Sequence, residues 1–150
     1  MKSRSNLSRL ESPAEQKAHG PLLALLWIQS VYFLVTGIWP LVDVDSFQAV
    51  TGPKTDLWLV RTVGVLITAI GLALVSAALR RRVNRETFIL ATASALALAA
   101  IDVIYVSVGR ITRIYLADAA LEAILIAGWL ILYAAATPKL ADVPMSSEQP

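Results

Sequence analysis

The chain alternates long apolar runs with short polar connections. The runs extend from about Pro21 to Pro40, Asp56 to Leu79, Glu86 to Val108 and Ile114 to Thr137. Each supplies the roughly 20 mainly apolar residues that an α-helix needs to cross about 30 Å of hydrocarbon. None of them alternates apolar and polar residues with the period of two that a half-buried strand requires. The pattern predicts an all-α fold, a membrane-spanning antiparallel four-helix bundle.

The connection between the first two runs, residues 41–55, is longer and more apolar than the others. Apolar side chains recur there at three-residue spacing, at Val44, Phe47 and Val50. Asp45 or Ser46 can cap a helix at this place, and Gly52-Pro53 signals a turn after it. We therefore expect a short interfacial helix in the first outer loop, with a plain surface loop as the alternative.

Small residues recur at helical spacing within three of the runs. The stripes are Gly64, Thr68 and Gly71, then Ala95 and Ala99, then Ala119, Ala123 and Ala127. Small side chains let helices approach closely in lipid, so we interpret the stripes as contacts within the bundle, with oligomer contacts as the alternative. Because the last two connections are short, we expect the last three long helices to pack as antiparallel neighbours.

Composition supports a membrane protein and excludes several kinds of site. Of 150 residues, 57% are hydrophobic and 16% are charged, whereas soluble domains carry about 25% charged residues. The chain has no cysteine and a single histidine, which excludes disulfides, thiolate catalysis and multi-histidine metal sites. The net charge of +2 is too small to predict a nucleic-acid partner, and we expect no cofactor. The polar ends, residues 1–20 and 138–150, are predicted to be flexible cytoplasmic segments around a transmembrane domain at 21–137.

Lysine and arginine are distributed unevenly between the two sides that the crossings define. One side holds Lys2, Arg4, Arg9, Lys17, Arg80, Arg81, Arg82, Arg85 and Lys139. The other side holds Lys54, Arg61, Arg110 and Arg113. Because basic residues gather on cytoplasmic loops, we expect both termini in the cytoplasm and the protein in an inner (plasma) membrane. The connection at 80–85 is also a candidate for contact with anionic lipid head groups.

Ionisable side chains fall inside the predicted spans, all in the half nearer the outside. They are Arg61, Asp102, Asp118 and Glu122, at depths of about 7, 9, 6 and 12 Å from the outer helix ends. Such groups are costly in hydrocarbon and usually face the bundle interior. Asp118 and Glu122 share one helix face. We expect Arg61 to pair with one or two of the carboxylates, which leaves Glu122, the deepest, in its neutral form.

Two further polar residues extend this candidate site. Gln29 lies near the middle of the first run, where it is expected to complete a polar layer with Glu122, and Tyr105 offers a hydroxyl. The candidate ligand-binding residues are thus Arg61, Asp102, Asp118, Glu122, Gln29 and Tyr105, with no metal site. Three interpretations stay open: a structural cluster, a site for a small molecule or ion, and separate side chains that reach the interface.

The stretch GIWPLVDVDSFQAVTGPKTDLWLVRTVG, residues 37–64, resembles a motif of small uncharacterised bacterial four-helix integral membrane proteins. The resemblance implies a bacterial inner membrane and brings no activity with it. It would place residues such as Trp39, Pro40, Gly52, Asp56 and Arg61 around the outer mouth of the bundle.

Three functions compete at this stage. The first is a non-enzymatic structural or accessory membrane protein. The second is a binding or transport protein for a small molecule or lipid, using the carboxylate–arginine cluster. The third is a membrane enzyme with a carboxylate as general acid and base, which ranks last because no nucleophile–base arrangement, phosphate loop or metal motif is present. A homo-oligomer or a membrane-protein partner is compatible with each.

Overall fold

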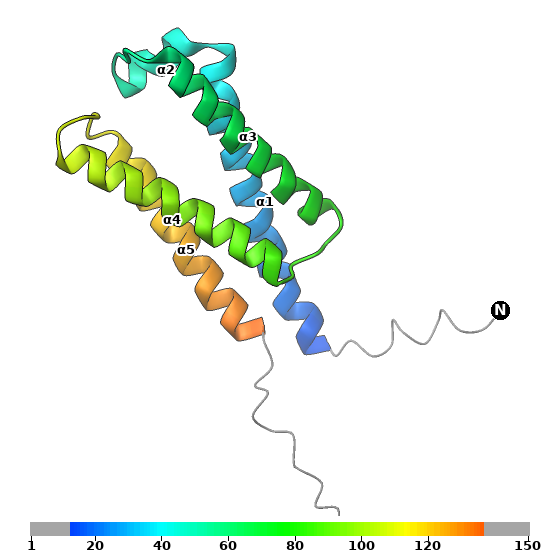
Figure 1. Ribbon diagram of the computed structural model, residues 1–150. Helices are drawn as coiled ribbons and strands as arrows, with labels where there is room; N and C mark the ends of the chain where they lie inside the picture. Colours follow the sequence, from blue (N-terminus) through cyan, green and yellow to red (C-terminus); the bar gives the residue numbers. More distant parts are fainter. Residues whose placement is uncertain (1–12, 137–150) are drawn as a thin grey trace, which may run out of the picture.

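The computed structural model describes residues 13–136, with side chains from residue 20 onward, and this part of the chain is all-helical (Figure 1). The helices are α1 (Pro13–Val42), α2 (Val44–Thr51), α3 (Leu57–Leu79), α4 (Arg85–Ser107) and α5 (Tyr115–Ala136). The prediction of an all-α fold is confirmed for these residues. The tail at 138–150 and most of the N-terminal segment lie outside them, and α1 begins at Pro13, before the predicted Pro21.

Among residues 13–136, four helices are long and apolar enough to cross a membrane, which is typical of a multi-pass membrane protein. The spans are Gly20–Val42, Leu57–Leu79, Arg85–Ser107 and Tyr115–Ala136. They agree with the predicted runs to within two residues at every end. The ends agree because local residues mark where a helix begins or ends. Asn84, for example, caps α4 by accepting a hydrogen bond from the Thr87 amide at 3.0 Å.

The long helices are arranged as two tight pairs, α1 with α3 and α4 with α5 (Figure 1). Helix α1 also contacts α5 over a shorter stretch, whereas α3 and α4 meet at only a few points. The prediction that α3, α4 and α5 pack as successive neighbours is therefore wrong for α3 and α4. The short connection brings their ends together, but α3 uses its small-residue face against α1 instead.

Two glycines make the contact between α1 and α3 unusually close. A Cβ atom added to Gly64 would lie 2.7 Å from the carbonyl oxygen of Gly37, and one added to Gly37 would lie 2.7 Å from the backbone nitrogen of Thr68. Real Cβ atoms essentially never come within 3.0 Å of such atoms. The predicted stripe of Gly64, Thr68 and Gly71 is thus a contact surface within the chain.

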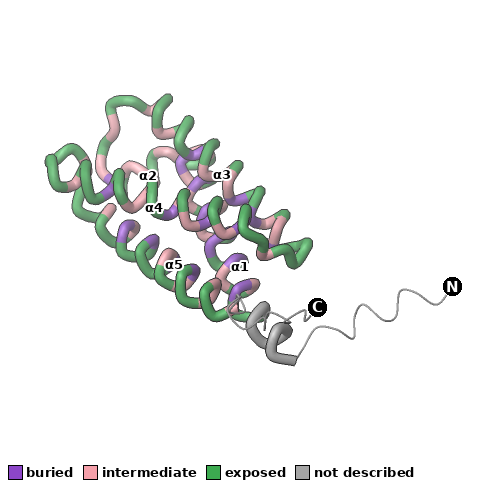
Figure 2. Tube along the Cα trace, turned by 60° about the horizontal axis from the view of Figure 1, so that its bottom comes forward, coloured by how far each residue is buried: buried purple, intermediate pink, exposed green. Residues whose placement is uncertain are grey.

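The apolar core lies nearer the connection between α3 and α4. Its fully enclosed side chains come from all the long helices: Leu22, Leu26, Phe33, Leu74, Ala78, Ala91 and Trp129. Figure 2 shows buried positions on the inward sides of the helices and exposed positions around the outside. On α5 the inward face is Ala119, Glu122, Leu125 and Trp129, while Ala123 and Ala127 are exposed. The prediction that Ala123 and Ala127 pack within the bundle is therefore wrong.

The short helix α2 forms where the sequence predicts one, but its cap is a different residue. The Asp43 carboxylate accepts a hydrogen bond from the Ser46 amide at 3.0 Å, so Asp43 is the N-cap in place of Asp45 or Ser46. Trp39 donates from Nε1 to the Ser46 hydroxyl at 2.8 Å and meets Phe47 edge to face. The helix ends at Thr51 and is followed by its C-cap Gly52, whose φ of 88° suits glycine.

Candidate functional site: a carboxyl cluster on α4 and α5

Three acidic side chains, Asp102 of α4 and Asp118 and Glu122 of α5, form what we call the carboxyl cluster. Asp102 continues the α4 face that carries the buried Thr87, Ala91 and Ala95, so its position follows from helical periodicity. Asp118 and Glu122 are one turn apart on α5. The exposed fraction is 0% for Glu122 and 6% for Asp102, and Asp118 is half-buried.

The deepest carboxyl group has no polar partner in the part of the chain that the structure describes. Both Oε atoms of Glu122 and Oδ2 of Asp102 are buried without a hydrogen bond there. Asp102 and Asp118 both lie within electrostatic range of Glu122, so negative charges on these three groups would repel one another. A buried carboxylate in this position is costly unless it takes a proton or meets a cation.

Arg61 does not supply that cation. Its side chain is exposed, and among residues 20–136 it makes no ion pair with any of the three acids. The expected ion pair is therefore absent among these residues, because α3 pairs with α1 and is rotated so that Arg61 points away from the acids. The face of α3 that packs against α1 runs through Val60 and Gly64, and Arg61 lies to one side of it, whereas the acids belong to the α4–α5 pair.

Gln29 is fully buried but belongs to a different polar contact from the one predicted. Its Nε2 donates to the carbonyl oxygen of Ala91 at 2.8 Å, and its Oε1 accepts from Nε1 of Trp129 at 2.6 Å. This amide joins α1, α4 and α5, so both of its ends are used without Glu122. Sequence reasoning missed Trp129; the available signal was its place seven residues after Glu122, on the same helix face.

Tyr105 is the remaining predicted residue, and it does not join the cluster. Its exposed fraction on α4 is 47%, and the buried face of that helix passes through Asp102 instead. The predicted site is thus divided into the carboxyl cluster, the contact of Gln29 with Trp129, and two exposed side chains, Arg61 and Tyr105.

The cluster is acidic and does not form a chelate. Within residues 20–136 no group of three or more histidine, cysteine, aspartate or glutamate side chains is placed to hold a metal ion. Each carboxyl group can instead accept hydrogen bonds from an ammonium group or carry a proton. The chemistry available here is recognition of positive charge in apolar surroundings.

Comparison with known proteins does not add a family to this geometry. No family model, no curated protein and no solved structure matches the chain. The resemblance of residues 37–64 to small bacterial four-helix membrane proteins therefore stays a prediction.

Proposed function

We propose that this chain is a non-enzymatic protein of a bacterial inner membrane that binds a small organic cation at the carboxyl cluster. The observation that carries the proposal is Glu122, which is fully buried, has no hydrogen-bond partner for either carboxyl oxygen among the described residues, and lies within range of two more acids. An ammonium group supplies both the charge and the N–H donors that this arrangement lacks.

The arrangement of the helices supports an organic cation in preference to a metal ion. The described residues offer no three-ligand cluster, and the surroundings of Glu122 on α5 include Ala119 and Leu125. An amine with a short apolar body satisfies a carboxylate and an apolar wall together.

Helix α2 is the proposed cover of the site, lying at the outer membrane interface. Thr112 donates from its hydroxyl to the Thr51 carbonyl at 2.8 Å, which joins the end of α2 to the segment before α5. Lys54 also lies over the Tyr115 ring, 4.9 Å from its centroid. In this proposal both termini are cytoplasmic, as the distribution of lysine and arginine favours.

Thermal unfolding in nanodiscs of uncharged lipid tests the cation site, with butylammonium chloride as the probe. We expect butylammonium to raise the unfolding temperature of the wild type and of Asp45→Asn, a control that removes an exposed carboxylate on α2. The increase should be absent in Glu122→Gln, and 1-butanol should have no comparable effect on any of them.

Other outcomes of this experiment would favour a structural or accessory protein. Equal shifts in all three proteins would show simple partitioning of the amine into the membrane. If no protein responds, native mass spectrometry of the chain released from its own membrane is decisive. An additional protein mass, retained by Glu122→Gln, would replace the cation site with an accessory role.

A further inference from the structure

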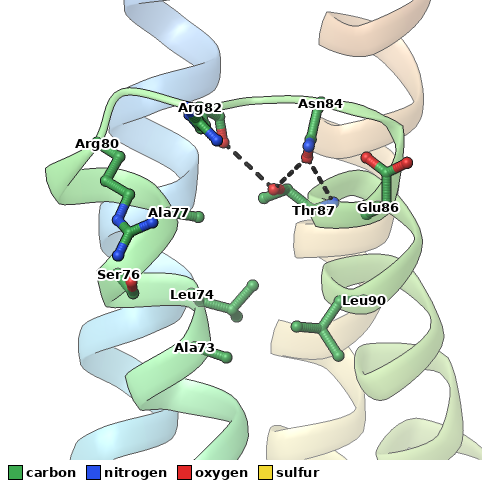
Figure 3. A pocket seen from close by; sticks show the side chains of 10 residues that line it. All are labelled: Ala73, Leu74, Ser76, Ala77, Arg80, Arg82, Asn84, Glu86, Thr87 and Leu90. Carbon is green, nitrogen blue, oxygen red and sulfur yellow. Dashed lines mark hydrogen bonds between the residues drawn. The ribbon is translucent and has the colours of Figure 1, made fainter.

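A cavity of about 260 Å³ opens at the other end of the molecule from α2, between the end of α3 and the start of α4 (Figure 3). Its polar side is formed by Arg80, Arg82, Asn84 and Thr87, and its apolar side by Leu74 and Leu90 with small residues between them. None of the carboxyl cluster lines it. It exists because α3 and α4 meet at only a few points.

The loop that carries the arginines is held in one shape by backbone hydrogen bonds. The amide of Arg81 donates to Ala78 and that of Arg82 to Ala77, both at 3.0 Å. This turn requires a φ of 52° at Arg81, a left-handed conformation that non-glycine residues rarely adopt. As a result Arg80 and Arg82 line the cavity, whereas Arg81 and Arg85 do not.

The far wall of the cavity is equally well defined. The Asn84 carboxamide oxygen accepts from the Thr87 amide at 3.0 Å and from the Thr87 hydroxyl at 2.7 Å (Figure 3). These contacts occupy the amide and hydroxyl donors of Thr87 locally. Recognition of an anion therefore falls to the arginine side chains, and Glu86 on the same lining leaves the sum of the charges positive.

Polar and apolar groups in the cavity are arranged in order along the helices. In Figure 3 the Arg82, Asn84 and Thr87 side chains lie near the loop, and Leu74 and Leu90 face one another farther along α3 and α4. The long Arg80 side chain starts at the loop and extends along α3 to the level of Ser76. Both helices are candidate membrane spans, so this order runs from a membrane face toward the hydrocarbon. A phospholipid has the same order, with a phosphate above an acyl chain.

We propose that this cavity binds one anionic phospholipid, with its phosphate between Arg80 and Arg82 and an acyl chain along Leu74 and Leu90. Guanidinium groups match phosphate oxygens in geometry as well as in charge. The apolar wall makes a lipid the occupant in preference to free phosphate. The proposal requires only that this loop lies at a membrane face, and it does not depend on the carboxyl cluster.

Two paired substitutions in the same loop distinguish a built site from a charged surface. Arg80→Gln with Arg82→Gln removes the cavity arginines, while Arg81→Gln with Arg85→Gln removes the same charge outside it. Native mass spectrometry in mild detergent with added phosphatidylglycerol measures retention, with phosphatidylcholine as the uncharged comparison. We expect the first pair to weaken phosphatidylglycerol retention by about tenfold or more and the second pair to leave it near wild type.

Three results would overturn the proposal. Equal losses in both pairs would show a diffuse charge effect, and equal retention of phosphatidylcholine would show no anion recognition. Displacement by inorganic phosphate at the same concentration would identify a soluble anion as the ligand. The pair Arg80→Lys with Arg82→Lys keeps the charge if the glutamine pair fails to fold, and we expect intermediate retention because the guanidinium geometry is lost.

Discussion

Trp129 and Gln29 form a hydrogen bond of 2.6 Å between the indole Nε1 and the amide Oε1, with both side chains fully buried. Because Gln29 also donates to Ala91, this single amide links three of the long helices. It is a polar contact whose partners are both satisfied, unlike the carboxyl groups of the neighbouring cluster.

Removal of the indole donor should therefore destabilise the protein. Trp129→Phe leaves the Gln29 oxygen buried without a partner, and we expect a loss of about 1–3 kcal/mol in the free energy of unfolding in detergent. Trp58→Phe is the matched control, because Trp58 is 69% exposed, and it should have little effect. A loss in Trp129→Phe no larger than that of the control would show that the hydrogen bond contributes nothing.

The close crossing of α1 and α3 gives a second test. Gly64→Ala forces a Cβ against the Gly37 carbonyl oxygen, which belongs to backbone and cannot move aside cheaply. We expect destabilisation of about 1–3 kcal/mol, measured by chemical unfolding in detergent. Gly20→Ala, where nothing lies within 4 Å of the added atom, is the control and should lose no stability. Gly71→Ala should fall between them, because its contacts, all with Leu34, are 3.1–3.2 Å away and two of the three are side-chain atoms.

Substitution of Arg61 should have little effect on stability. The side chain is exposed and has no acidic partner among residues 20–136, so Arg61→Ala should change the free energy of unfolding by less than about 0.5 kcal/mol. Thermal unfolding of the two proteins side by side is sufficient. A loss of several kcal/mol would restore the ion pair that the sequence pattern suggested.

Glu122 should react with dicyclohexylcarbodiimide, an apolar reagent that modifies protonated carboxyl groups in lipid-like surroundings. A buried carboxyl without a partner takes a proton more readily than an exposed one, so intact mass should show one adduct, lost in Glu122→Gln. Butylammonium should slow the labelling if it binds at the cluster. Labelling at Asp45 or Asp56 in preference to Glu122 would contradict the burial on which the proposed function rests.

The start of α2 should respond to acid. The Ser46 amide and hydroxyl hold the pKa of Asp43 below its ordinary value of 3.8. Because the pKa is lower in the folded state, the ionised cap stabilises α2 fully at pH values above the ordinary pKa of 3.8. This stabilisation is lost as the pH falls through the lower pKa of the folded state. The NMR shift of the Ser46 amide should titrate with a midpoint below 3.8, and Asp43→Asn should abolish the transition. A midpoint above 3.8 would contradict the hydrogen-bonded cap.

Sequence periodicity was sufficient for the spans and for α2, because helix ends are marked locally by residues such as Asn84 and Gly52. It also placed Asp102 and Glu122 inside the molecule, because an ionisable side chain within a membrane span is unfavourable in contact with lipid and usually faces the bundle interior. It did not pair the helices, because that depends on how closely Gly37 and Gly64 let two backbones approach. The rotation of α3 then left Arg61 exposed, and no local pattern encodes that rotation.

The two tight helix pairs have a consequence for how the chain is made. Each pair joins consecutive crossings, so the growing polypeptide delivers one complete hairpin to the bilayer before the next begins. Asp102, Asp118 and Glu122 all belong to the second hairpin. The acidic side chains thus enter the membrane last, after the first hairpin, whose spans contain no acidic residue, is already in place.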